Sequence, residues 1–509
     1  MTRRVFVVVA LGVVATVCAA SLSVVTPPSA GAATTSGPGA ITAGAFGDAV
    51  GVDVHLGLPG LSYADFPRVE TLLVHLGVHH VRTALPRSPT PRFYGEVKDL
   101  AARGIRTDLI LGSAGAPKGG SASLTPVATE IARIDANGLA PALDAIEGPN
   151  EWDSRGGATW ATQVRNYQIQ LYHSVKSDSQ LQAIPVIGPS VANIDDASEL
   201  GDLSGSLDYG NIHPYPRGDQ PLSRLQTQQA GEHPVSGSKP VMATEAGYQT
   251  AVNGSGLQPP VSPATQAVYL SWLYPAFASA HVARTYVYEL LDDRKDPTLS
   301  VEESNFGIVT ASGVSKPAYP AIQNLLAVTG AATPSSAIDT SDDPVHLSSG
   351  TDAPSHLIVR RADGAWVVLL WTAAVVASDL KTLHALPAGT ASTELSAPGY
   401  VATIYRPALQ AKALRTFAAG STVTGTVGPD LAVVVFGRRA PSGATLVPAS
   451  SSSSVNAFAS SYQTVPAITS SSDAGIVIGA TVLIVLVIVA VVLVLIRRRR
   501  SGNGGAEST

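Results

Sequence analysis

Short apolar runs alternate with amphipathic stretches from about residue 45 to residue 330 of the chain. Each apolar run is short and ends near a Gly, Pro or polar residue, which is typical of buried strands in a parallel sheet. The stretch 63–76 places its apolar side chains on one helix face, and 161–174 is similar. The predicted strands are 49–54, 78–84, 107–112, 143–147, 185–188, 209–213, 240–245 and 284–290. Eight strand–helix units in this order predict an α/β fold, a (β/α)8 TIM barrel, over residues 45–330.

The pattern changes after the predicted barrel. Residues 338–440 contain β-rich runs separated by turn signals such as Asp363-Gly364, which predicts a small all-β sandwich domain. Residues 40–46, which come before the barrel in the chain, are candidates to contribute to the sandwich domain. Residues 441–473 are rich in Ser, Ala and Thr and predict a flexible linker that is too polar to bury a core.

Both ends of the chain carry apolar segments. Two arginines precede the first, and Ala30-Gly31-Ala32 follows it, so residues 1–33 read as a signal peptide, with a retained anchor as the alternative. Residues 474–496 form an uncharged apolar run, roughly 34 Å long as a helix, and four arginines follow at once. We therefore expect one transmembrane helix, a cytoplasmic tail over 497–509 and an extracellular N-terminal ectodomain at the cell membrane. A buried core helix is the alternative for 474–496.

Composition narrows the class of function. The net charge is −5 and charged residues make up 14% of the chain, without a basic patch that would indicate nucleic acid as a partner. The one cysteine, Cys18, lies in the predicted signal peptide, so the mature chain depends on its core rather than on disulfides. No clustered His, Cys or Asp spacing indicates a metal site, and we expect no cofactor.

Two carboxylates lie at the ends of predicted strands. Glu151, directly preceded by Asn150, follows the strand 143–147, and Glu245 ends the strand 240–245. The carboxyl ends of barrel strands converge on one face, where active sites form. Two acids at one pocket are what hydrolysis of a glycosidic bond needs, because one protonates the leaving oxygen and the other attacks or activates water.

Further polar residues pass the same strand-end test, and each has a structural alternative. Arg82, His213 and Tyr215 all lie near strand ends, and His55 lies near the end of the first strand. His213 is also compatible with a core histidine, and His55 with either a pocket or a structural role. The two glutamates are also compatible with solvated loop acids. Glu147, inside the fourth strand, could pair with Arg82 or take part in catalysis.

In these motifs the chain resembles a clan A glycoside hydrolase, a superfamily of retaining (β/α)8 enzymes that includes cellulases and β-xylosidases. The resemblance covers residues 49–326. It implies that Glu151, after Asn150 on the fourth strand, is the acid/base, and that Glu245 on the seventh strand is the nucleophile. The clan's second-strand Arg and sixth-strand His or Tyr match Arg82, His213 and Tyr215, and the segment 305–319 is also similar to such families.

The resemblance implies a mechanism with net retention. Arg82 and Tyr215 would keep Glu245 ionised, Asn150 would bind the sugar 2-hydroxyl, and the two carboxyl groups would lie about 5–5.5 Å apart. We therefore expect a cell-surface glycoside hydrolase acting on an extracellular polysaccharide or glycoconjugate. A non-catalytic carbohydrate-binding or cell-wall protein and an envelope-glycan transglycosylase are the alternatives.

The chain departs from the family at the end of the eighth strand. Many members place a Trp there as a sugar platform, whereas this chain has Tyr288-Glu289. We expect Trp152 and Tyr248 to supply stacking instead. Glu289 is a further candidate for the sugar pocket, for an ion pair with an arginine, or for the nucleophile.

Overall fold

The computed structural model describes residues 39–112, 123–333, 338–349, 352–376, 391–448 and 456–458. The predicted signal peptide, transmembrane helix and cytoplasmic tail lie outside these residues, as does most of the predicted linker. Within the described part of the chain, no helix is both long and apolar enough to span a bilayer.

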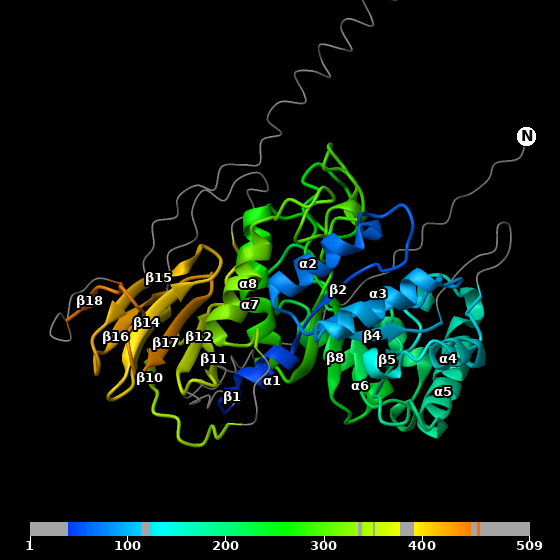
Figure 1. Cartoon of the computed structure of the whole chain (residues 1–509), viewed down its shortest axis with the longest axis horizontal. Helices are drawn as coiled ribbons and strands as arrows, with labels where there is room; N and C mark the ends of the chain where they lie inside the picture. The colour runs from blue at the N-terminus through cyan, green and yellow to red at the C-terminus, as the bar shows by residue number, and fades with distance from the viewer. Residues whose placement is uncertain are drawn as a thin grey trace, which may run out of the picture. The chain divides into compact units, whose positions relative to one another are not determined.

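Eight parallel strands form the barrel that the sequence predicts (Figure 1). In chain order they are β2 (Val50–Asp53), β3 (His80–Ala84), β4 (Arg106–Ile110), β5 (Leu143–Glu147), β6 (Val186–Ile187), β7 (Gly210–Ile212), β8 (Val241–Ala246) and β9 (Val282–Val287). Each strand pairs with its neighbour in the chain, β9 pairs with β2, and a parallel bridge between Ile187 and Tyr209 joins β6 to β7. The sheet is therefore closed, and all strands point their carboxyl ends at one face.

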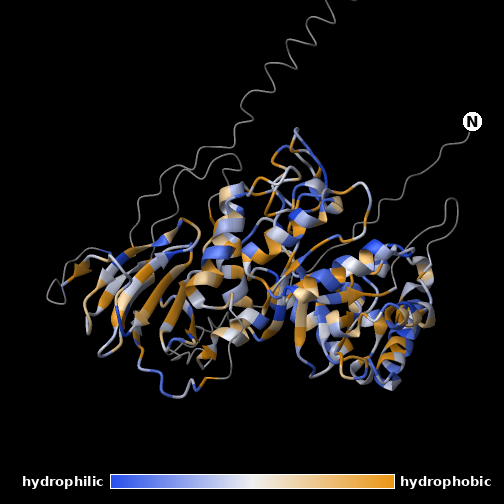
Figure 2. Ribbon diagram, viewed as in Figure 1, coloured by the Kyte–Doolittle hydropathy of each residue, from blue (hydrophilic) through white to orange (hydrophobic). Residues whose placement is uncertain are grey.

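Helices follow seven of the eight strands. They are α2 (Phe66–Leu76), α3 (Pro91–Ala102), α4 (Val127–Ala136), α5 (Trp160–Ser177), α6 (Leu225–Ser236), α7 (Pro263–Ser279) and α8 (Ala318–Thr329). After β6 the described chain forms the 3₁₀ segment η5 (Ile194–Leu200) in place of an α-helix. In Figure 2 the helices around the barrel carry hydrophilic residues beside hydrophobic ones, which is expected of helices with one face against a sheet.

Helix α2 shows how the sequence pattern produces one of these units. Its apolar positions recur at helical spacing, so that Val69, Leu73 and Leu76 are fully covered against the barrel. Pro67 stands in the first turn, where its missing N–H costs nothing. The helix ends at Gly77, whose φ of 85° is a left-handed conformation that favours glycine.

The β-sandwich has a seven-stranded and a three-stranded sheet. The larger sheet contains β1 (Ile41–Thr42), β11 (Ser355–Arg360), β12 (Trp366–Trp371), β17 (Ala432–Gly437), β14 (Val401–Arg406), β15 (Gln410–Phe417) and β18 (Leu446–Val447), in this spatial order. The smaller sheet contains β10 (His346–Ser349), β13 (Ala391–Ser396) and β16 (Val423–Val427). β1 pairs in parallel with β11, so residues before the barrel do contribute to this domain. A short helix, α1 (Ala43–Asp48), connects β1 to the barrel.

The barrel and the larger sheet share one hydrophobic core. Helix α7 is apolar on all sides and its residues from Thr265 to Phe277 are buried, because it packs on β9 and also on β11. The Trp272 ring of α7 stacks on Trp371 of β12, with centroids 6.4 Å apart. A hydrogen bond also crosses between the two parts, because the Val376 N–H donates to the Tyr269 hydroxyl oxygen at 2.9 Å.

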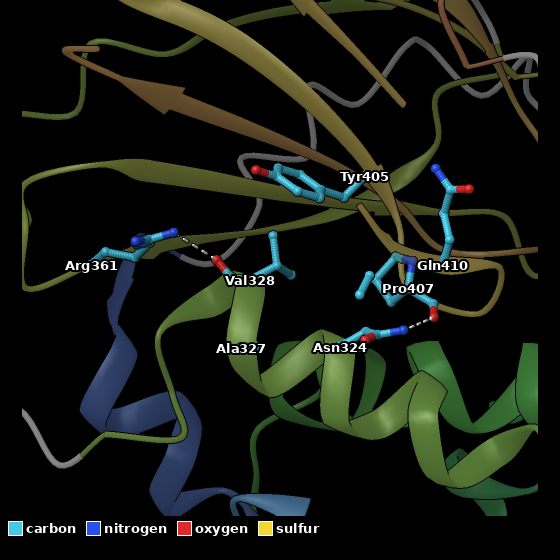
Figure 3. Close-up of a pocket in the computed structure, with 8 residues that line it drawn as sticks. Asn324, Ala327, Val328, Arg361, Tyr405, Pro407 and Gln410 are labelled. Carbon is cyan, nitrogen blue, oxygen red and sulfur yellow. Dashed lines mark hydrogen bonds between the residues drawn. The ribbon is translucent and has the colours of Figure 1, made fainter. Parts of the chain in front are cut away.

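A small cavity of about 190 Å³ lies where α8 meets the sandwich (Figure 3). The Asn324 amide donates to the Pro407 carbonyl at 2.9 Å, and the Arg361 guanidinium donates to the Val328 carbonyl at 3.2 Å. The polar groups around this cavity therefore join the sandwich to the barrel.

The segment that follows β9 is anchored by one buried lysine. The Lys316 ammonium donates to Asp292 Oδ1 at 2.7 Å, to Thr250 Oγ1 at 3.0 Å and to the Asn305 carbonyl at 3.1 Å. All three of its protons are therefore used. This fixes the loops after β8 and β9 against each other and holds Phe306 over the carboxyl face of the barrel.

Candidate active site

A cavity of about 780 Å³ opens at the carboxyl ends of the barrel strands, a size usual for a ligand pocket. Seven of the ten residues selected from the sequence line this cavity: His55, Arg82, Asn150, Glu151, His213, Tyr215 and Glu245. They come from five different strands and the loops after them. The strand-end rule therefore brings together residues that are up to 190 positions apart in the sequence.

Arg82 is the centre of the polar network at the base of the cavity. Its guanidinium is 2% exposed and forms a bidentate pair with Glu147, with both N–O distances at 2.7 Å. It also donates to Glu245 Oε1 at 2.7 Å and to Asn150 Oδ1 at 2.6 Å, and more weakly to Asp53 Oδ1 at 3.1 Å. A buried guanidinium is stable only when carboxylates compensate it. Glu147 thus takes the structural role that was one of its two interpretations.

Glu245 is held as a carboxylate. Burial alone would raise its pKa, but the positive charges of His213 and Arg82 and hydrogen bonds from Arg82 and Tyr215 lower the pKa to about 2. The Tyr215 hydroxyl donates to Glu245 Oε2 at 2.8 Å. The side chain keeps 10% of its surface exposed towards the cavity. Glu245 is therefore charged and accessible at neutral pH.

Glu151 stands in an unusual backbone conformation. Its φ is 47°, in the left-handed region that a non-glycine residue seldom occupies, and such positions cluster at functional sites. The backbone N–H of Glu151 donates to the Ser190 carbonyl at 3.2 Å, which holds the turn. A quarter of the side chain surface is exposed to the cavity. One oxygen of Glu151 and one of Glu245 lie within 4.8 Å of each other.

The hydrogen bonds of His213 fix which nitrogen carries a proton. The Asn211 amide donates to Glu147 and to the Gly188 carbonyl, both at 3.0 Å, so its oxygen faces Thr244. The Thr244 hydroxyl donates to that oxygen at 2.6 Å. The Thr244 hydroxyl has only one proton, and this bond uses it. The hydroxyl oxygen therefore accepts a hydrogen bond from His213 Nε2, 3.0 Å away, so Nε2 carries the hydrogen.

The other ring nitrogen of His213 contacts Glu151. His213 Nδ1 lies 2.8 Å from Glu151 Oε1. A hydrogen bond there needs one proton, which is either on the carboxyl of Glu151 or on an imidazolium. Burial alone would lower the pKa of His213, but the charges of Glu245 and Glu151 raise it. One proton therefore lies in the contact between Glu151 and His213.

Asn150 is oriented by its neighbours. Its Oδ1 accepts from Arg82 and, at 3.0 Å, from the Ser190 hydroxyl. Because both contacts go to the oxygen, the amide nitrogen points the other way and can donate to a ligand.

The expected sugar platforms require a correction. Trp152 is 1% exposed and donates from Nε1 to Gln163 at 2.9 Å, and Tyr248 is 2% exposed and stacks on Tyr269. Neither lines the cavity. Both side chains point into the core, because the turn after β5 and the loop after β8 each fold back onto a helix. The pattern of apolar and polar residues does not predict the path of these two segments.

Glu289 also differs from its expected place. It is fully buried and does not line the cavity, and its partners are His55 Nε2 at 3.2 Å and the Tyr63 hydroxyl at 2.9 Å, rather than an arginine. Burial raises the pKa of Glu289 to about 7, against the opposing charge of His55. Burial would lower the pKa of His55, but Glu289 raises it to about 9. Glu289 therefore acts on the cavity through His55, and it lacks the access that a nucleophile needs.

Several cavity residues were missed by the sequence reasoning. Asp53 ends β2 and Tyr288 follows β9, so the strand-end rule could have selected both. Burial raises the pKa of Asp53 to about 8, and Glu245 adds to this while Arg82 opposes it. Phe306 comes from a loop and carries no sequence signal. The Tyr215, Tyr288 and Phe306 rings meet edge to face, with centroids 5.3–6.3 Å apart, and form the aromatic wall of the cavity.

Among the residues that the structure describes, two groups of side chains have the ligand types of a metal site. They are Glu151 with His213 and Glu245, and His55 with Glu289 and Asp293, and in each the ligand atoms lie within 4.8 Å of one another. In both groups the imidazole nitrogen already contacts a carboxylate oxygen. The absence of a metal stays a prediction.

Comparison with known proteins places this geometry in a fold family. No family model matches the sequence, and no curated protein matches it either. Among solved structures, a glycoside hydrolase family 39 enzyme from Xanthomonas axonopodis pv. citri is similar with a TM-score of 0.51 at 14% identity, over 79% of this chain and 96% of that one. A family 39 β-xylosidase from Caulobacter crescentus gives 0.50 at 12% identity, over 79% and 98%. The chain therefore has the fold of the clan A (β/α)8 glycosidases that its sequence resembles.

Proposed function

We propose that this protein is a retaining glycoside hydrolase, with Glu245 as the nucleophile and Glu151 as the acid/base. The separation of the two side chains carries the proposal. Their nearest oxygens lie within 4.8 Å, which suits the roughly 5–5.5 Å of retaining enzymes and is too short for a water between them, which needs about 6.5–9.5 Å.

The ionised state of Glu245 suits a nucleophile, and the contact of Glu151 with His213 Nδ1 suits an acid/base. Glu245 is ionised and attacks the anomeric carbon, while Glu151 gives its proton to the glycosidic oxygen as that bond breaks. The products of this step are a glycosyl–Glu245 ester and a free leaving group. Glu151, now a carboxylate, then takes a proton from water, and the resulting hydroxide oxygen displaces Glu245. His213 supports both steps because it can hold the proton of this contact when Glu151 is charged.

The remaining cavity residues suit a bound sugar. The free amide nitrogen of Asn150 can donate to the 2-hydroxyl, a contact that strengthens in the transition state. Tyr288 and Phe306 offer an aromatic wall for the apolar face of the ring, in place of Trp152 and Tyr248. His55, held by Glu289, can bind a further hydroxyl.

The ends of the chain suggest where the substrate lies. An export signal over 1–33 and a membrane helix over 474–496 would keep the barrel outside the cell. We propose that the substrate is an extracellular polysaccharide or glycoconjugate.

Azide rescue tests the proposal. With aryl glycosides as substrates, we expect Glu245→Ala and Glu151→Ala each to lose activity by at least about a hundredfold. Azide should restore turnover in both, giving a glycosyl azide of inverted configuration from Glu245→Ala and of retained configuration from Glu151→Ala. Glu303→Ala, which removes another carboxylate of the same cavity, is the control and should show no rescue.

Two outcomes would contradict hydrolysis. If the wild type binds polysaccharide without turnover of any glycoside, the protein is a binder. If the glycosyl group appears on an added glycan rather than on water, the same covalent chemistry serves a transglycosylase.

A further inference from the structure

Three arginines line the cavity without an acidic partner. They are Arg155 in the loop after β5, and Arg217 and Arg224 in the loop after β7. None of the three forms an ion pair with any residue that the structure describes. Arg155 and Arg217 are exposed and Arg224 is half-buried, so the three guanidinium groups are accessible to a ligand in the cavity. The wall of the cavity formed by the loops after β6 and β7 contributes no carboxylate to its lining, so it carries one sign of charge.

A buried amide beside these arginines also lacks a partner. Gln228 is 6% exposed and lines the cavity, and its side chain has no hydrogen bond to any described residue. The amide oxygen and nitrogen of Gln228 are not sealed off from solvent, so they open onto the cavity and can bind a ligand there. Gln228 is therefore a second and independent sign that this part of the cavity receives a polar ligand.

Gln228 and Arg224 both belong to the start of α6. Arg224 is the N-cap residue, no side chain caps this end, and the first turn contains no acidic residue. The free N–H groups and the helix dipole at such an end favour a negative charge. Arg217, Arg224, Gln228 and the N-terminus of α6 together form what we call the arginine corner.

The arginine corner adjoins the reaction centre. Arg217 lies two residues after Tyr215, whose hydroxyl contacts Glu245, and prolines flank Tyr215 on both sides and stiffen the segment. Arg155 lies four residues after Glu151. A sugar next to the bond being cleaved would therefore lie within reach of these side chains.

We propose that the arginine corner binds an anionic group of the glycan, so that the substrate is an acidic saccharide. This inference rests on the proposed hydrolase function and adds its substrate class. A guanidinium presents paired N–H donors that match the oxygens of a carboxylate, sulfate or phosphate, and Gln228 adds an amide donor. A neutral sugar would form no charge-assisted hydrogen bond with Arg217 and Arg224, whereas an anionic group can accept from both.

Binding to matched glycans tests the proposal. The full chain carrying Glu245→Gln, which blocks turnover, is presented with xylan and glucuronoxylan, galactan and polygalacturonate, dextran and dextran sulfate, and mannan and phosphomannan. We expect binding of at least one anionic member to exceed that of its neutral partner by at least about tenfold, and to weaken as salt rises. The pair that shows the difference identifies the anionic group as carboxylate, sulfate or phosphate.

Variants of the arginine corner link the preference to the site. Arg217→Gln with Arg224→Gln, and separately Gln228→Leu, should reduce the preference for the anionic member by at least about tenfold. Lys412→Gln with Arg439→Gln removes the same number of positive charges, two, at exposed positions of the sandwich and should leave the preference unchanged, as should Arg439→Gln alone. Circular dichroism confirms that each variant is folded.

The outcomes separate this inference from the proposed function. Equal binding within every pair, binding of neutral members alone, or no binding overturns the arginine corner, as does a corner variant that behaves like Arg439→Gln. Turnover of neutral aryl glycosides in that case leaves the hydrolase in place. Conversely, a strong anionic preference without any turnover supports the corner and contradicts the hydrolase.

Discussion

Thr244 shows how one hydroxyl controls the candidate acid/base from outside the cavity. It donates to Asn211 and so must accept from His213, which leaves Nδ1 of the ring facing Glu151. Asn211 in turn donates to Glu147, the partner of Arg82. The residues that face the substrate are thus oriented by a chain of hydrogen bonds whose members are buried, and such outer partners are often as important as the groups they hold.

Replacing Thr244 tests this chain of hydrogen bonds. Thr244→Val keeps the shape but removes the acceptor for His213 Nε2–H, so the ring loses its fixed tautomer. We expect kcat to fall by roughly ten- to a hundredfold, with a shift in the limb of the pH–rate profile that reports the acid/base. Thr107→Val is the matched control, because Thr107 is also buried on a barrel strand and its hydroxyl has no hydrogen-bond partner. Equal profiles for the two variants would contradict the role of Thr244.

Helix α6 combines two roles at the scale of an element. Its N-terminus forms part of the arginine corner, while Glu232, two turns further on, contacts the base of β7. Glu232 is 1% exposed, and its Oε1 accepts from the backbone N–H of Asn211 at 3.2 Å. Burial raises the pKa of Glu232 from 4.5 to about 8. The contact between α6 and β7 therefore depends on a carboxyl group that stays protonated near neutral pH.

A stability measurement checks this protonation. Between pH 4.5 and 8 the folded state keeps the proton of Glu232 while the unfolded state releases it, so stability falls as the pH rises through this window. Glu232→Gln cannot ionise, and we expect it to raise the melting temperature relative to wild type at pH 8 but not at pH 4.5. Glu199→Gln, at an exposed position, is the control and should change neither. Calorimetry at the two pH values decides the matter, and a constant difference between Glu232→Gln and wild type would contradict the assignment.

The whole molecule is held together by the core that the barrel and the sandwich share. α7 is buried on all sides, and α8 is joined to the sandwich through Asn324 and Arg361. β1, which precedes the barrel in the chain, is hydrogen-bonded into the sandwich sheet. Since neither part covers α7 alone, we expect the two to unfold as one cooperative unit.

Trp371 offers a test of this coupling. Trp371→Ala removes a buried ring from the sandwich that stacks on Trp272 of the barrel helix, at a cost of about 3–5 kcal/mol. We expect one unfolding transition at lower temperature, in which catalytic activity and circular dichroism are lost together. Val375→Ala, at an exposed position nearby, should leave the transition in place. A variant that keeps barrel activity after the sandwich has melted would show that the two parts are independent.

The sequence by itself determined the barrel, its strands and most of the candidate site. Strands can be located from short apolar runs that end at Gly, Pro or polar residues, because a buried strand needs apolar side chains. In a closed parallel barrel the carboxyl ends of all strands lie at the same face. Glu151, Glu245, Arg82, His213 and Tyr215 could therefore be selected from position alone. The tertiary structure decided what the loops do. The side chains of Trp152 and Tyr248 lie in the core, and Phe306 lies over the cavity. Glu289 pairs with His55, and the arginine corner has no acidic partner among the described residues. These outcomes depend on where each loop meets its neighbours, and no periodic pattern along the chain encodes such contacts.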